Sequence, residues 1–475
     1  MAPTPTPDFT TTVAHPTDAT TPAAPPAAPA PAPAPAEGAL VHRHGRWIEH
    51  WNPENKDQWV HEGRDIARRN LVWSIFAEFL GFAVWALWSI VVPQLNNAGF
   101  ALSVDQMFWL VSVPSLVGAT LRIPYTFAVP LFGGRNWTVI SALLLLLPTL
   151  GLVWAVNNPQ LPFGVLLLIA ALAGVGGGNF ASSMANISFF FPESEKGKAL
   201  GLNAAGGNIG TAAVQFAVPL VIVTGSGIAL DRAGLMFVPL IALAAFAAWR
   251  WMDNLAGASS DPRSFAAATS QPHTWILSFI YIGTFGSFIG YSGAFPTLLK
   301  AQFPEVTLSV AFLGALVGSV ARPLGGILAD RFGGAWITIV SFAAMALGAW
   351  GAISGLGRHN FALFFASFLG LFVFTGIGNG SIYRMIPAVF RATASDTSDA
   401  GLLTARKAAA GCIGIAGAVG AFGGFLIPRG FAISVSQAGS LVPALWVFIG
   451  AYVAMGLVTW AFYLNPRSAV AAHAI

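Results

Sequence analysis

Long, nearly uncharged apolar runs recur along the whole chain and constrain its fold more than any other feature. Two examples are residues 71–95 and 337–357. Each is long enough to cross a bilayer, since a membrane-spanning helix needs roughly 20 residues. Hydrophobic residues make up 55% of the 475 residues and charged residues only 9%, so a soluble fold could not bury this apolar surface. The sequence therefore predicts an all-α integral membrane protein.

Hydropathy predicts twelve membrane spans. They are expected at 71–95, 106–131, 137–156, 163–191, 198–223, 233–252, 274–299, 308–329, 336–355, 361–388, 404–428 and 441–464. Lys and Arg are concentrated in the N-terminal segment and in the loops that would share its side of the membrane. By the positive-inside rule, we expect a multi-pass protein of the plasma (inner) membrane, surrounded by lipid, with both termini in the cytoplasm.

The N-terminal region divides into two parts of different composition. Residues 1–46, rich in Ala and Pro, predict a disordered cytoplasmic tail. Residues 47–70 are polar and are expected to lie along the cytoplasmic surface, with Trp47, Trp51 and Trp59 at the level of the lipid headgroups.

The sequence also contains an internal repeat, because its two halves match at a constant offset of 200 residues. Identical pairs include Arg122/Arg322, Gly133/Gly333, Gly134/Gly334, Thr138/Thr338, Ser141/Ser341, Gly176/Gly376, Asn179/Asn379 and Gly201/Gly401. Two pseudo-symmetric six-helix halves follow, 71–252 and 273–464, with a cytoplasmic linker at 253–272 and a cytoplasmic tail at 465–475. Parallel repeats of this kind build the major facilitator fold, in which the substrate site lies at the midplane between the halves.

Two arginines, Arg122 and Arg322, lie inside otherwise apolar spans. A charge at such a depth costs about 2.5–3.5 kcal/mol on insertion scales, so a partner is expected. No Asp or Glu lies near either arginine at helical spacing, and the only carboxylate well inside a span is Glu78. The repeat places both arginines at equivalent depth on facing halves, where one bound anion could neutralise both. The alternative is that each arginine snorkels to an interface or caps backbone carbonyls.

The chemistry of arginine and the surrounding glycines narrow the choice of ligand. A guanidinium donates paired hydrogen bonds to planar oxyanions, so carboxylate, nitrate, nitrite and phosphate all remain possible. The glycine-rich segments 174–184 and 201–210 carry small residues at helix-packing spacing. Such residues allow helices to approach closely and favour a narrow site for a small ligand.

From about residue 47 to 464 the chain resembles the nitrate/nitrite porters (NarK type) of the major facilitator superfamily. The resemblance rests on GGGNFASSMANISFFFPESEKGKALGLNAAGGNIG (176–210) and GIAGAVGAFGGFLIP (414–428). In that family two arginines bind the anion, and the matching positions are Arg122 and Arg322. The family's aromatic rings and asparagine around the ion correspond to Phe180, Tyr281, Phe285 and Asn208. The resemblance implies a monomeric transporter of nitrate and nitrite, which is not an enzyme and needs no cofactor.

A second motif and the scarcity of acidic residues bear on mechanism. The segment GGILADRFGG (325–334) resembles the superfamily's cytoplasmic gating loop, which implies that Asp330 and Arg331 control conformation. Apart from Glu78, the spans contain no central carboxylate and no histidine near the proposed site. Exchange of nitrate for nitrite is therefore favoured over proton symport. If symport operates, Glu78 is the candidate for proton coupling.

Other classes of function fit the sequence less well. Paired histidines within spans are missing and Cys412 is the single cysteine, so we predict no metal site and disfavour a membrane enzyme subunit. The net charge of +4 is small and the positive residues are scattered along the chain, which argues against nucleic-acid binding. The repeat and the gating-like loop argue against a channel, and a receptor would not explain the paired arginines. Transport of another small monoanion remains the main competitor: planar formate or bicarbonate, or pyramidal chlorate.

Overall fold

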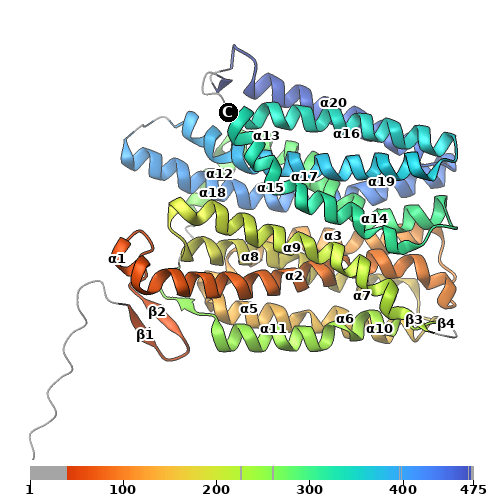
Figure 1. The fold of residues 1–475 in the computed structure, drawn as a ribbon, viewed down its shortest axis with the longest axis horizontal. Helices are drawn as coiled ribbons and strands as arrows, with labels where there is room; N and C mark the ends of the chain where they lie inside the picture. Colours follow the sequence, from red (N-terminus) through yellow and green to blue (C-terminus); the bar gives the residue numbers. More distant parts are fainter. Residues whose placement is uncertain are drawn as a thin grey trace, which may run out of the picture. The chain divides into compact units, whose positions relative to one another are not determined.

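The computed structural model is dominated by helices that run side by side along the chain's main body (Figure 1). It describes residues 40–224, 227–258, 262–394, 396, 398–468 and 470–471. Twelve of the helical segments found there are long and apolar enough to cross a membrane, so the predicted all-α membrane fold is confirmed. The tail expected to be disordered lies outside the described residues as far as residue 39.

The first half contains six spans, several of them broken by a single non-helical residue. They are α2 (Arg64–Leu95), α3 (Val104–Thr126) with α4 (Ala128–Phe132), α5 (Gly134–Leu144) with α6 (Leu146–Val156), α7 (Phe163–Leu172) with α8 (Gly174–Phe190), α9 (Glu193–Ile222), and α10 (Asp231–Leu235) with α11 (Phe237–Trp251). A short helix α1 (Lys56–Gln58) and a π turn (Trp59–Gly63) precede α2, and the strands β3 (Val223–Thr224) and β4 (Gly227–Ile228) follow α9. The first span begins earlier than expected, because the polar residues 64–70 continue the helix beyond its apolar part.

The second half repeats this order. After the linker helix α12 (Pro262–Ser270), its elements are α13 (Pro272–Tyr281), a π turn (Ile282–Gly286), α14 (Ser287–Gln302), a 3-10 turn (Leu308–Val310), α15 (Phe312–Phe332), α16 (Gly334–Gly357), α17 (Phe361–Ala392), α18 (Asp399–Ala421), α19 (Gly423–Ala438) and α20 (Val442–Tyr463). The span expected at 404–428 ends ten residues later, at Ala438, because α19 continues through Pro428 rather than ending there.

The internal repeat is visible in both packing and backbone. In the first half α3 packs against α8, and the corresponding α15 packs against α17 in the second half. Gly133 and Gly333 occupy equivalent turns with φ of +85° and +86°, a left-handed conformation that favours glycine. The repeat in the sequence thus reflects two structurally equivalent six-helix halves.

The described residues before α2, 40–63, form a folded segment that we call the N-terminal collar. Strand β1 (Val41–Arg43), expected to be part of the disordered tail, pairs antiparallel with β2 (Trp47–Glu49), and β2 pairs parallel with β5 (Asn254–Leu255) at the start of the linker. Trp59 is only 7% exposed and its ring lies 5.8 Å from that of Phe191. Trp51 donates to the carbonyl oxygen of Phe189 at 3.0 Å. These two rings therefore pack against the aromatic residues at the end of α8.

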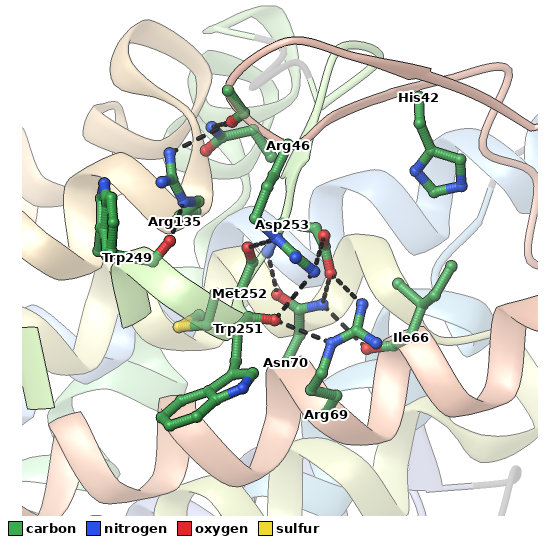
Figure 2. Close-up of polar contacts among 12 residues, drawn as sticks. His42, Arg46, Ile66, Arg69, Asn70, Arg135, Trp249, Trp251, Met252 and Asp253 are labelled. Atoms are coloured by element: carbon green, nitrogen blue, oxygen red, sulfur yellow. Dashed lines mark hydrogen bonds and ion pairs between the residues drawn. The ribbon is translucent and has the colours of Figure 1, made fainter. Parts of the chain in front are cut away.

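A buried carboxylate, Asp253, fastens this collar to α2 (Figure 2). Its side chain is 3% exposed and accepts from Arg46 Nη2 at 2.7 Å and from Arg69 Nη2 at 2.8 Å. Asn70 Nδ2 donates to the same carboxylate at 2.9 Å, and Asn70 Oδ1 accepts from the Asp253 backbone N–H at 2.8 Å. Such a carboxylate is fully paired, as burial requires.

Arginines also cap the end of α11. Arg135 Nε, Arg69 Nε and Arg46 Nε donate at 2.8 Å to the carbonyl oxygens of Trp249, Trp251 and Met252 respectively. The last carbonyls of a helix have no partner within the helix, and cations are favourable at this end of the helix dipole. Figure 2 shows these side chains converging from the hairpin, α2 and α5 on the same helix end.

Candidate substrate site between the halves

Arg122 lies on α3 and bridges the two halves of the protein. It is 1% exposed. Its Nε donates to the carbonyl oxygen of Gly177 on α8 at 3.2 Å, and its Nη1 donates to that of Gly417 on α18 at 2.6 Å. Two of its donor atoms, Nε and Nη1, therefore cap backbone carbonyls, which is the alternative that the sequence left open. Nη2, however, has no hydrogen-bond partner among the described residues.

Arg322 occupies the equivalent position on α15 and is 6% exposed. Its Nη1 also lacks a hydrogen-bond partner in the part of the chain that the structure describes. Within those same residues, no ion pair joins Arg122 or Arg322 to a carboxylate. The site therefore holds two buried positive charges with unused donors.

One aromatic ring brings the two arginines together. Phe180, on α8, has its ring centroid 4.6 Å from Cζ of Arg122 and 6.0 Å from Cζ of Arg322. Phe285 lies 5.0 Å from Cζ of Arg122, and its ring is stacked on that of Phe180 at 6.2 Å. The guanidinium groups from the two halves thus meet at aromatic faces, where cations bind favourably.

Tyr281 extends this aromatic group within the second half. Its ring stacks on Phe285 at 5.2 Å, and its hydroxyl donates to Oδ1 of Asn379 at 2.6 Å. The π turn after α13 carries Phe285, and such irregular turns re-aim side chains at functional positions. Gly420 in the second glycine motif allows the close approach, because a Cβ there would lie 2.6 Å from the Tyr281 ring.

A second tyrosine, Tyr383, was not identified from the sequence. It lies on α17 with its ring 4.8 Å from Cζ of Arg322 and 5.5 Å from the ring of Tyr281. The residue 200 positions earlier is Ser183, so the repeat gave no aromatic signal. Its spacing of four residues from Asn379, which places both on one helix face, is the signal that could have revealed it.

Asn208 and Glu78 are buried in the first half, at the contact of α9 with α2. Asn208 is 1% exposed and its Oδ1 has no partner among the described residues. Glu78 is also 1% exposed, and neither carboxylate oxygen has a hydrogen-bond partner in the described chain. A Cβ on Gly207, next to Asn208, would lie 2.6 Å from the Glu78 side chain. Within the described residues, no hydrogen bond joins Asn208 to the aromatic group around the arginines.

The gating-loop residues lie in the second half alone. Asp330, at the end of α15, forms an ion pair with Arg384 of α17. Arg331 places its Cζ 5.3 Å from the ring of Phe332. The ion pair links α15 to α17, whereas the contact of Arg331 stays within α15, so neither contact reaches the first half.

The halves are joined at the opposite end, where α2 finishes and α3 begins. Arg429 of α19 forms an ion pair with Asp105 of α3 at 2.9 Å, and its Cζ lies 4.1 Å from the ring of Trp109. Deeper in, Gln215 Nε2 of α9 donates to the carbonyl oxygen of Ser292 on α14 at 2.7 Å. We call this region the Asp105 end.

Comparisons with known proteins agree with this architecture. The family model described as Major Facilitator Superfamily matches residues 74–428. The chain is 42% identical to "Nitrate/nitrite transporter NarU" of Salmonella typhimurium, over 88% of this chain and 96% of that one. It is 35% identical to "Probable nitrate/nitrite antiporter NarK2" of Thermus thermophilus, over 88% and 97%. Among solved structures, the inward-open xylose transporter XylE from E. coli matches with a TM-score of 0.64 at 15% identity, covering 85% of this chain and 98% of that one. This last likeness shows the fold alone.

Proposed function

Because the chain belongs to the nitrate/nitrite porter family of the major facilitator superfamily, we propose that it carries nitrate and nitrite across the inner membrane by alternating access. The observation that carries the proposal is the pair of buried arginines, Arg122 and Arg322. Both lie beside the ring of Phe180, and each has an N–H without a hydrogen-bond partner among the described residues. Close relatives bear the names of nitrate/nitrite transporters and of a nitrate/nitrite antiporter.

The charge and shape of the site suit a small planar anion. Arg122 and Arg322 each keep an N–H without a partner in the described chain, and a bound anion would supply both acceptors and negative charge. The rings of Phe180 and Phe285 lie against the Arg122 guanidinium, and Phe180 also lies 6.0 Å from Cζ of Arg322. A flat, weakly hydrated ion can therefore lie against aromatic faces while accepting hydrogen bonds at its edge. Nitrate and nitrite meet both requirements.

The same charges favour exchange over proton symport. The two like charges repel when the site is empty, because each arginine is desolvated and no carboxylate among the described residues forms an ion pair with it. A bound anion compensates them, so reorientation is easier with substrate than without it. The transporter would then release one anion only in return for another, and nitrite export would accompany nitrate import.

The contacts between the halves support a defined state in the transport cycle. The ion pair between Asp105 and Arg429 and the bond from Gln215 to Ser292 join the halves at the Asp105 end. With both termini in the cytoplasm, as the distribution of Lys and Arg favours, this end faces outward. We assign the structure to a state closed on the outside, in which Asp330 and Arg331 are released from the first half and act as conformational residues.

Uptake into vesicles tests this proposal. Purified protein, taken to act as a monomer, would be reconstituted into liposomes that are empty or loaded with nitrite, and nitrate uptake would be followed with and without an inward proton gradient. We expect uptake only into nitrite-loaded vesicles, with no effect of the gradient. Uptake into empty vesicles that follows the gradient would establish symport and make Glu78 the first residue to mutate as the candidate for proton coupling.

Competition distinguishes nitrate from other small monoanions. Formate, chlorate and bicarbonate would each be added outside nitrite-loaded vesicles during nitrate uptake. We expect little inhibition at concentrations where unlabelled nitrate competes fully. Stronger inhibition by one of these ions than by nitrate would reassign the substrate.

A further inference from the structure

Four aromatic rings and the Arg322 guanidinium form a closed series of contacts at the candidate site, which we call the aromatic circuit, and the Arg122 guanidinium lies against two of its rings, Phe180 and Phe285. Phe180 stacks with Phe285, Phe285 with Tyr281, and the Tyr281 ring lies 5.5 Å from that of Tyr383. Arg322 completes the circuit, since its Cζ lies 4.8 Å from the Tyr383 ring and 6.0 Å from the Phe180 ring. Tyr383 is therefore part of the wall of the site.

Three polar groups at the aromatic circuit are buried and unpartnered. They are Nη2 of Arg122, Nη1 of Arg322 and the hydroxyl of Tyr383, each without a hydrogen-bond partner among the described residues. They come from three different helices, α3, α15 and α17. By contrast, the neighbouring Tyr281 hydroxyl is engaged, because it donates to Asn379. Buried donors left unpaired are costly and are rare in native proteins.

We propose that Tyr383 is the residue that distinguishes nitrate from nitrite, by donating a third hydrogen bond to the bound anion. The inference rests on the proposed function. Nitrate is trigonal and planar with three oxygens, so two arginine N–H groups and one hydroxyl can each meet one oxygen. Nitrite has two oxygens, which the arginines satisfy, and its nitrogen is one bond length farther from the hydroxyl than a third oxygen would be. The hydroxyl thus stabilises bound nitrate more than bound nitrite.

The experiment compares the affinities of the purified protein for nitrate and nitrite by titration calorimetry. Tyr383→Phe removes the hydroxyl but keeps the ring beside Arg322. We expect the Kd for nitrate to rise about tenfold, which corresponds to about 1.4 kcal/mol, while the Kd for nitrite changes less than about threefold. Tyr463→Phe is the matched control, because the Tyr463 hydroxyl contacts His273 at 3.2 Å, away from the site; it should leave the ratio of the two affinities unchanged.

The possible outcomes separate the inference from the proposed function. If Tyr383→Phe melts at the temperature of the wild type and its Kd values for nitrate and nitrite rise equally, or do not change, then Tyr383 does not discriminate between the anions and the inference is wrong. The proposed function would still stand if the wild type binds both anions and Arg322→Lys loses both. If the wild type binds neither anion, the proposed function fails and the inference with it.

Discussion

Replacing Asp253 with alanine tests whether the N-terminal collar is held by one buried carboxylate. Asp253 is 3% exposed and pairs with Arg46 and Arg69. Removing one partner of a fully buried ion pair costs about 3–5 kcal/mol, because a charge is left without compensation. Here the arginine side chains are 32% and 36% exposed and keep their carbonyl acceptors. Since partial solvation reduces the penalty, we expect a loss of about 2–3 kcal/mol in unfolding free energy.

Thermal unfolding of the purified protein in detergent measures this loss. We expect the Tm of Asp253→Ala to fall by about 5 °C. Asp57→Ala is the matched control, because Asp57 lies in the same N-terminal segment but is exposed and forms no ion pair among the described residues. A Tm for Asp253→Ala that matches that of the control would show that the network contributes nothing to stability, and the reasoning from burial would be refuted.

Two further predictions concern the transport cycle. Asp105→Asn removes the ion pair with Arg429. Because the Asp105 side chain is 45% exposed, this pair contributes only about 0.2–1 kcal/mol. We therefore expect the ratio of outward-open to outward-closed protein to rise by up to about fivefold. Distances between spin labels at the outer ends of α3 and α19 would show it, and an unchanged distribution would contradict it. Glu78→Gln should leave nitrate/nitrite exchange within about twofold of the wild type, since exchange needs no titratable group. Loss of exchange in that variant, measured in nitrite-loaded vesicles, would show that Glu78 takes part in transport.

The sequence was sufficient to predict those features that follow from hydropathy and from the repeat. Long apolar runs must be buried in lipid, so the twelve spans could be placed, and an unpaired charge at membrane depth identified Arg122 and Arg322 independently of any family. The equivalent turns at Gly133 and Gly333 followed from the offset of 200 residues. These signals are local or periodic, and for this reason a single sequence contains them.

Features that depend on packing between distant segments could not be predicted in this way. Tyr383 lacks an aromatic counterpart in the first half, so neither the repeat nor its local sequence distinguished it. Asp105 and Arg429 are 324 residues apart and meet only because α3 packs against α19. The strands β1 and β2 have three residues each, too few for a periodic pattern, and Asp253 is recognisable as their anchor only once the fold is known.

The most direct test of the account is nitrate uptake into nitrite-loaded vesicles by Arg122→Lys and Arg322→Lys. Lysine keeps the positive charge but loses the planar fork of donors, so we predict that the initial rate falls tenfold or more in either variant. Arg358→Lys serves as the control, because Arg358 is exposed in the turn after α16, and it should transport normally. Near-normal uptake by either of the first two variants would contradict the claim that the paired arginines bind the transported anion.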